Sequence, residues 1–140
     1  MFDSILVAID GSEHGRRAAK MAADLARMAA AREIRMVVAF DPVPSFLGEP
    51  GLSRAMAART KEAEEIAAGA KAIIGDNPAE LHIEILEGSP AEAILQVAAT
   101  RKPDVIVMGS RGLGRLQGAL LGSNSQKVVA HAACPVLIVR

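Results

Sequence analysis

The residues best suited to chemistry lie in a glycine-rich segment that runs from Gly109 to Ser125. Its sequence is Gly-Ser-Arg-Gly-Leu-Gly-Arg-Leu-Gln-Gly-Ala-Leu-Leu-Gly-Ser-Asn-Ser. Glycines let backbone N–H groups approach an oxyanion closely, and successive N–H groups in such a turn form an anion nest. Ser123 and Ser125 can add hydroxyl donors, and Arg111 or Arg115 can add positive charge. The segment therefore has the chemistry of a polyphosphate cradle, with a surface loop containing a glycine-rich turn as the alternative.

Two familiar phosphate-binding motifs are missing from the chain. A P-loop needs a Gly-Lys pair, and none occurs anywhere in the sequence. The dinucleotide fingerprint should follow the first strand, but Asp10-Gly11-Ser12 is not followed by glycines at the required spacing. The sequence therefore supports neither a motor-type nucleotide hydrolase nor a dinucleotide-dependent dehydrogenase.

Hydrophobic periodicity places this segment within an alternation of strands and helices. The run from Ser4 to Ile9 and the run from Val105 to Met108 are continuously apolar, as in strands that are buried on both faces. The other expected strands are 33–40, an alternating edge strand 81–87, and 135–139. The segment 41–50, which holds three prolines, predicts a loop that is either a lid over a ligand or a simple connection.

Helix-start signals precede the intervening segments. Ser12 is a good N-cap, and the first helix should bury one face of small and apolar residues: Ala18, Met21, Ala22, Leu25 and Ala29. Ser89-Pro90-Ala91-Glu92 reads as a capping box with proline at the first helical position. The remaining helices are expected over about 52–74, with Gly75 as C-cap, and over about 123–132, with Ser123 as N-cap.

Strict alternation of strands and helices predicts one α/β domain over residues 1–140, with an open parallel sheet and helices on both faces. In such sheets, ligands bind outside the carboxyl ends of the strands where the winding direction reverses. The loops after the first and fourth strands therefore become the expected site. The glycine-rich segment directly follows the fourth strand.

Composition excludes several classes of protein. Apolar residues make up 51% of the 140 residues and aromatic residues only 2%, so we expect an aliphatic core and no ring platform for nucleic acid. Cys134 is the single cysteine, which rules out a disulfide scaffold within the chain. No apolar run is long enough to span a membrane, and no secretory leader is evident, so the expectation is a soluble cytoplasmic protein.

The net charge is zero, but the charges are unevenly distributed. All 16 acidic residues lie at or before Asp104. The last part of the chain, from Val105 onward, carries only basic charges, on Arg111, Arg115, Lys127 and Arg140. This part is therefore a candidate anion-binding region, with chance placement on a solvated surface as the alternative.

The spaced motif Gly109-x2-Gly112-x9-Gly122-Ser123 resembles the ATP-binding signature of the universal stress protein family. The flanks match as well, including Ile9-Asp10-Gly11-Ser12 and Cys134-Pro135-Val136, and the resemblance covers essentially the whole chain. It implies a Rossmann-like, five-stranded sheet of order 3-2-1-4-5. It also implies a homodimer, commonly formed by pairing of the last strands.

The resemblance also implies roles for individual residues. Asp10 would hydrogen-bond the ribose, although on its own it could simply be an Asx-turn residue before Gly11. Phe40 matches the position that contacts adenine. Ala8 and Ile9 would line the pocket, and Met108 and Gly109 would lie under the base and the ribose. The phosphates would be surrounded by Arg111, Gly112, Gly122, Ser123 and Asn124, with Ser125 beside them.

These observations predict an ATP-binding regulator of the stress response, with an unidentified protein partner and Mg²⁺ held mainly by phosphates and water. One alternative is a slow ATPase or phosphotransferase at the same site, and another is an interaction module with a degenerate site. A fast enzyme is disfavoured because Asp10 is the only acid near the segment and no histidine is close in sequence. His14, His82 and His131 have no metal-ligand spacing and are expected at the surface or at helix ends, and Cys134 is expected to be inert.

Overall fold

The computed structural model describes residues 1–111 and 121–140. The described residues form a parallel sheet of five strands in the order β3-β2-β1-β4-β5. The strands are β1 Ser4–Ile9, β2 Glu33–Phe40, β3 Glu80–Glu87, β4 Val105–Gly109 and β5 Val136–Val139. The predicted fold class and strand order are confirmed. The winding direction reverses between β1 and β4, which pair directly through Ile5↔Val105, Leu6↔Ile106 and Val7↔Val107.

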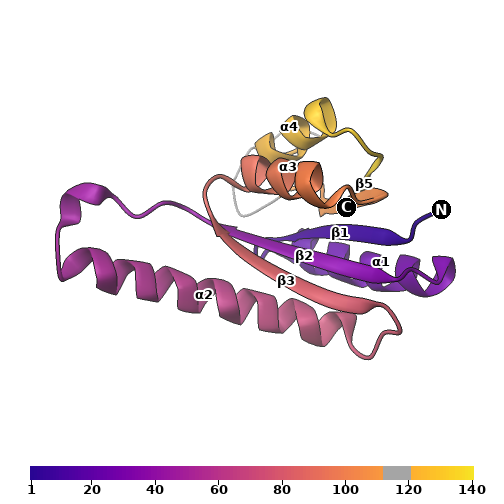
Figure 1. Ribbon diagram of the computed structural model, residues 1–140, viewed down its shortest axis with the longest axis horizontal. Helices are drawn as coiled ribbons and strands as arrows, with labels where there is room; N and C mark the ends of the chain where they lie inside the picture. Colours follow the sequence, from indigo (N-terminus) through magenta and orange to yellow (C-terminus); the bar gives the residue numbers. More distant parts are fainter. Residues whose placement is uncertain (112–120) are drawn as a thin grey trace.

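Helices cover both faces of the sheet. They are α1 Glu13–Ala29, α2 Gly51–Ile74, α3 Pro90–Arg101 and α4 Ser123–His131, with a short 3₁₀ turn η1 at Ser45–Leu47. Figure 1 shows α3 and α4 on one side of the sheet and α1 and α2 on the other. Two aliphatic clusters fill these interfaces, one beneath α1 and α2 and one beneath α3 and α4. The core is aliphatic, as the composition predicted.

The helix signals were mostly read correctly. The Ser12 hydroxyl accepts from the Gly15 amide at 3.0 Å and caps α1, and Ser89 caps α3 by accepting from the Glu92 amide. The predicted cap of α4 is wrong by one residue, because the N-cap is Gly122 and Ser123 is the first helical residue. Gly122 has the extended backbone of an N-cap, and no side chain caps this helix.

The predicted buried face of α1 is wrong at Met21, which is 41% exposed. The buried face is instead a stripe of small residues: Gly15, Ala18, Ala19, Ala22, Ala23 and Ala26. Small side chains let the α1 backbone pack close to β1 and β4, so a long methionine is displaced to the helix flank. The prediction holds for Ala18 and Ala22, which are buried, and for Leu25, which packs against the core.

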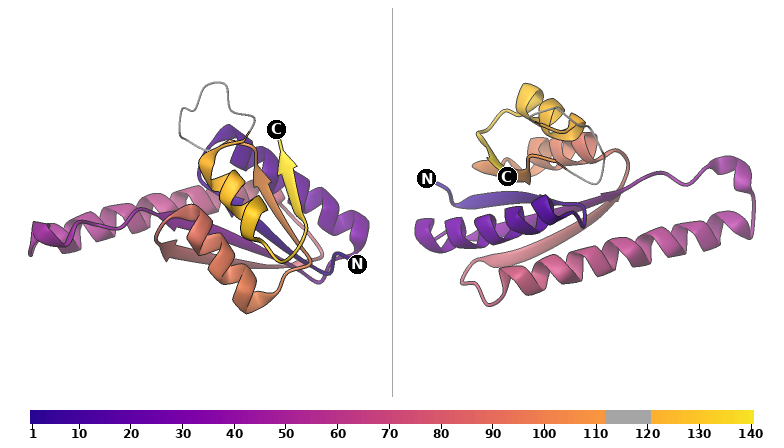
Figure 2. Two further views of the ribbon diagram at one scale, coloured as in Figure 1. Left: turned by 90° about the horizontal axis from the view of Figure 1, so that it is seen from above. Right: turned by 180° about the vertical axis from the view of Figure 1, so that it is seen from behind.

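The first half of α2, with segment 41–50 and η1, extends well beyond the end of the sheet (Figures 1 and 2). Phe46 at this extension is 86% exposed and Leu47 is 45% exposed. The second half of α2 packs on the sheet through Ala63, Ala67, Ala70 and Ile74. Among the described residues, no helix combines the length and the apolar character that crossing a membrane requires.

Candidate functional site

A pocket of about 460 Å³ lies at the carboxyl edge of the sheet, and we call it the carboxyl-edge pocket. It spans the ends of β1, β2 and β4 and is closed by α2 on one side and by the starts of α3 and α4 on the other. Its volume is within the range of small-molecule sites. Every predicted binding residue that the structure describes lines it: Ala8, Ile9, Asp10, Phe40, Met108, Gly109, Arg111, Gly122, Ser123, Asn124 and Ser125. Gly112 and Arg115 lie outside the described residues.

At the end of β1, Asp10 uses one carboxylate oxygen to build a turn. Its Oδ1 accepts from the Ser12 amide at 2.9 Å and from the Ser12 hydroxyl at 2.5 Å. The alternative interpretation of Asp10 as an Asx-turn residue is thus confirmed, yet the residue also lines the pocket. Because Oδ2 has no hydrogen-bond partner among the described residues, it remains able to accept from a ligand hydroxyl.

The end of β4 is held by α1. A Cβ placed on Gly109 would lie 2.7 Å from the Cβ of His14, so only glycine allows this close approach. The Nδ1 atom of His14 lies 3.0 Å from the hydroxyl oxygen of the buried Ser110. His14 was predicted to lie at the surface or at a helix end, and it is the second residue of α1. The prediction did not include its contact with Ser110, which helps to fix the point at which the chain leaves β4.

The start of α4 is also tied to the end of β4. The Gly122 amide donates to the Ser110 carbonyl at 2.7 Å, and the Ser125 hydroxyl donates to the Gly109 carbonyl at 2.9 Å. The Ser125 hydroxyl was expected to be a donor for phosphate, but its proton already serves this backbone bond. Ser125 therefore lines the pocket while acting as a tie between two elements.

The first turn of α4 provides donors for an anion. No described side chain caps it, unlike α1 and α3, so the amides of Ser123, Asn124 and Ser125 receive no capping hydrogen bond from the described residues. Such amides carry partial positive charge, which the helix dipole reinforces. The exposed Arg111 lines the same part of the pocket. This end of the pocket therefore has donors and a positive charge that suit a phosphate-like group.

Asn124 joins α4 to α3. Its Oδ1 accepts from the Ala91 amide at 3.2 Å, so one oxygen of its side chain satisfies an amide in the first turn of α3. The Nδ2 group is left as the donor of the same amide side chain. The start of α3 also contributes Pro90 and Ile94 to the pocket wall.

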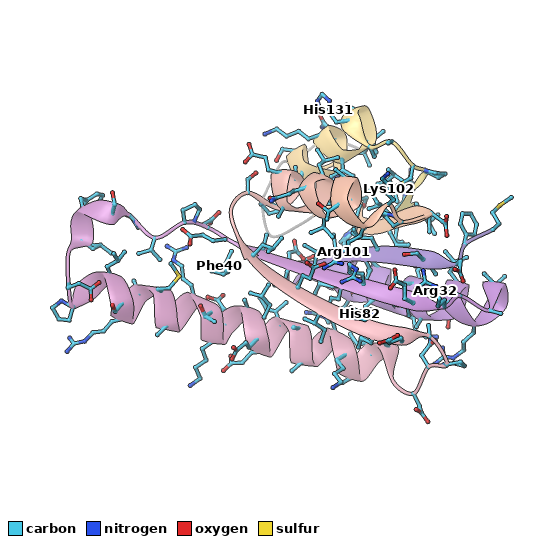
Figure 3. The ribbon with its side chains drawn as sticks, in the orientation of Figure 1. Arg32, Phe40, His82, Arg101, Lys102 and His131 are labelled. Carbon is cyan, nitrogen blue, oxygen red and sulfur yellow. The ribbon has the colours of Figure 1, made fainter. Side chains whose placement is uncertain are left out.

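The opposite end of the pocket is apolar. Phe40 lies where β2 leaves the sheet and packs into the cluster beneath α1 and α2 (Figure 3). Val38, Ala63 and Ile66 line the pocket beside it, and Met108 contributes from β4. A flat aromatic heterocycle would be surrounded by apolar side chains here, while its polar edge reached the pocket rim.

The sequence interpretation missed the contribution of α2. Arg59, Glu62, Ala63 and Ile66 all line the pocket, although α2 was expected only to cover the sheet. Their spacing follows one helix face, but that pattern alone does not say which ligand site the face meets. The face lines the pocket because α2 packs against the ends of β1 and β2, and this packing can be seen only in the folded structure.

The other titratable candidates lie elsewhere. His82 and His131 do not line the pocket, and Cys134 packs with the cluster beneath α3 and α4. Burial raises the pKa of the Cys134 thiol, which keeps it protonated at neutral pH. Within residues 1–111 and 121–140, no three side chains of His, Cys, Asp or Glu gather as a metal site would require.

Comparison with known proteins gives a consistent result. The sequence model of the family described as "Universal stress protein family" matches residues 1–140. The chain is 51% identical over 140 residues to "Universal stress protein in QAH/OAS sulfhydrylase 3'region" of Thermus aquaticus, with both chains covered completely.

Two solved structures illustrate the structural likeness. Universal stress protein UspA from Lactobacillus plantarum has a TM-score of 0.87 at 26% identity, with 99% of this chain and 98% of that chain covered. A universal stress protein in complex with cAMP has a TM-score of 0.68 at 27% identity, with 99% and 97% covered.

Proposed function

Since this chain belongs to the universal stress protein family, we propose that it binds ATP in the carboxyl-edge pocket and acts as a nucleotide-dependent regulator in the stress response. The observation that carries the proposal is the polarity of this pocket. Uncapped helix amides and Arg111 line one end, and an apolar slot beside Phe40 lines the other. A nucleotide has the same division into phosphates and base. The similar protein whose structure contains cAMP supports a nucleotide as the class of ligand.

The proposed binding mode assigns one part of ATP to each strand end. The phosphates accept from the amides at the start of α4 and pair with Arg111. The ribose hydroxyls donate to the Oδ2 atom of Asp10, whose other oxygen holds the β1 turn rigid. The base packs between Phe40 and Met108. Mg²⁺ enters with the nucleotide and is held by phosphates and water, because magnesium keeps much of its hydration shell.

We expect ATP to be held rather than rapidly consumed. Phosphoryl transfer needs a base or water-positioning group beside the γ-phosphate. The carboxylates that line the described part of the pocket belong to Asp10, Asp41 and Glu62, and the last two come from the β2–α2 side, away from the start of α4. Slow ATP hydrolysis at this site is the second candidate function. A turnover assay on the same protein distinguishes them, because a sustained rate near ~1 s⁻¹ would favour an enzyme.

For the regulatory output, we propose a homodimer that forms through the outer edge of β5. This strand pairs with β4 on one side only, within the described part of the chain. An unpaired parallel edge offers a row of N–H and C=O groups to a second copy. Because β4 and β5 are neighbours, nucleotide contacts at the end of β4 lie close to this proposed interface.

The test is isothermal titration calorimetry with ATP, AMP and cAMP, together with mass spectrometry of any nucleotide released when the purified protein is denatured. We expect micromolar-range binding of ATP. Gly122→Leu should weaken it about tenfold or more, because the side chain would stand over the amides that bind phosphate. The backbone of Gly122 has φ −66°, which any residue adopts, so the variant should fold.

Gly69→Leu is the matched control, because a Cβ at Gly69 meets nothing within 4 Å and this residue does not line the pocket. It should leave the affinity unchanged. If the unmodified protein binds none of the three nucleotides and releases none on denaturation, the proposed function is wrong.

A further inference from the structure

Helix α2 places one positively charged and one negatively charged side chain at the end of the carboxyl-edge pocket that we assign to the base. Arg59, Glu62, Ala63 and Ile66 are spaced as one face of a helix, and all four line the pocket. Ala63 is buried against the sheet, whereas Glu62 is exposed at the rim. The face therefore runs from the apolar floor of the pocket to its solvent edge.

Two contacts fix α2 at this position. A Cβ built on Gly11 would lie 3.2 Å from Cγ1 of Ile66, so the helix packs directly against the turn after β1. About two helical turns toward its N-terminus, the guanidinium of Arg59 donates to the Asp41 carbonyl at 3.2 Å, just beyond β2. Glu62 lies between these two anchor points in the sequence. Its place at the pocket is thus set by both strand ends.

The charge of Glu62 is the informative feature. No ion pair or hydrogen bond joins its carboxylate to any other described residue. A carboxylate repels phosphate, so it belongs at the end of the ligand that carries no charge. What it can recognise there is a hydrogen-bond donor on the edge of the base.

Building on the proposed function, we propose that Glu62 is the specificity-determining residue for the base, accepting a hydrogen bond from the exocyclic amine of adenine. Arg59 is a positioning residue, because its bond to the Asp41 carbonyl braces α2 beside Phe40. A purine that carries a carbonyl oxygen in place of that amine would direct a lone pair at the carboxylate. The pocket therefore selects 6-amino purines over 6-oxo purines.

The experiment compares ATP with inosine triphosphate, which has nearly the same shape but carries a carbonyl in place of the amine and a proton on N1. Titration calorimetry on the unmodified protein should give tighter binding of ATP by about tenfold, the effect of one hydrogen bond to a charged group. Glu62→Ala should remove that preference, chiefly by weakening ATP binding. Glu62→Gln keeps an acceptor oxygen and should retain part of it. Because Glu62 is exposed and has no partner among the described residues, both variants should fold, which circular dichroism checks.

Glu65→Ala is the matched control, since this carboxylate is exposed on the same helix and does not line the pocket. It should leave the preference unchanged. The inference is overturned if the unmodified protein binds both triphosphates equally, or if Glu62→Ala keeps the full preference for ATP. In either case, ATP binding itself would still support the proposed function. A protein that binds neither triphosphate would instead contradict the proposed function, on which this inference rests.

Discussion

Single residues at the carboxyl edge of the sheet have more than one task. Asp10 holds the turn after β1 with one carboxylate oxygen and faces the pocket with the rest of the side chain. Asn124 satisfies an amide of α3 and Ser125 a carbonyl of β4, while both line the same pocket. The proposed ligand contacts would thus come from residues that the fold already fixes, which would reduce the entropy lost on binding.

A second residue-scale feature lies at the other end of the sheet. The Ser4 hydroxyl donates to the buried carboxylate of Glu33 at 2.6 Å, and Arg35 and Arg32 lie nearby. This hydrogen bond, and then the two positive charges, hold the pKa of Glu33 below its ordinary value despite burial. A carboxyl group whose pKa is lower in the folded than in the unfolded state stabilises the protein at pH values above its unfolded pKa. That stability is lost as the pH falls through the folded pKa.

We therefore predict that Ser4→Ala lowers the free energy of unfolding by about 2 kcal/mol at pH 7, the range for hydrogen bonds to charged groups. The difference should shrink as the pH falls through the folded pKa of Glu33, because protonation removes the charged acceptor. Urea denaturation at pH 7 and at a series of lower pH values measures it. Ser53→Ala removes an exposed hydroxyl bond to Glu49 and should change stability by less than about 0.5 kcal/mol. A pH-independent effect of Ser4→Ala would contradict the argument.

At the scale of elements, the contact between α1 and β4 sets the shape of the phosphate end of the pocket. The Cβ of Gly109→Ala would lie 2.7 Å from the Cβ and 2.9 Å from the backbone carbon of His14, so α1 itself would have to move. We predict a loss of about 1–3 kcal/mol in stability, together with weaker ATP binding. Thermal denaturation and calorimetry measure the two effects.

The chain offers a contrasting glycine for the same experiment. Gly69 lies inside α2, and a Cβ there meets nothing within 4 Å. Gly69→Ala should raise stability by about 0.5–1 kcal/mol, because alanine loses less conformational entropy in a helix. Equal effects of the two substitutions on stability would show that the close approach of α1 to β4 does not require glycine at position 109.

The elements themselves were largely predictable from the sequence, since their signals are local. Continuous apolar runs and the caps Ser12 and Ser89 identify β1, β4 and the starts of α1 and α3. The exposure of Met21 on α1 was not predictable, because it depends on how closely that helix approaches the sheet.

The candidate site was predictable where resemblance or strand ends marked it, as at Asp10 and Gly109. His14, Arg59 and Glu62 were missed because they come from helices whose position beside the strand ends follows only from packing between elements. The role of each residue toward ATP stays a prediction for the titrations above.

At the scale of the whole molecule, the proposed dimer makes β5 the element to test. Leu137 is 36% exposed on this strand, which has one paired edge among the described residues. We predict a dimer by light scattering coupled to gel filtration, and a monomer for Leu137→Lys, because a charge would be buried at the new strand pair. Met28→Lys alters a residue that is 85% exposed on α1 and should leave the mass unchanged. A monomeric unmodified protein would refute the proposed assembly.

The strand order also has a consequence for protein synthesis. β1 lies between β2 and β4, and the Asp104 carboxylate accepts from the amides of Asp3 and Ser4, about 100 residues earlier in the chain. On the ribosome, β1, β2 and β3 emerge before β4 and can pair with one another. The edge of β1 that pairs with β4 is still unpaired at that stage. The part of the apolar end of the pocket that β2 and α2 provide exists by then, but Met108 of β4 and the first turn of α4 are still missing. A nascent or truncated chain would therefore lack the part of the pocket that we propose for the phosphates, and nucleotide binding would be among the last properties the protein gains.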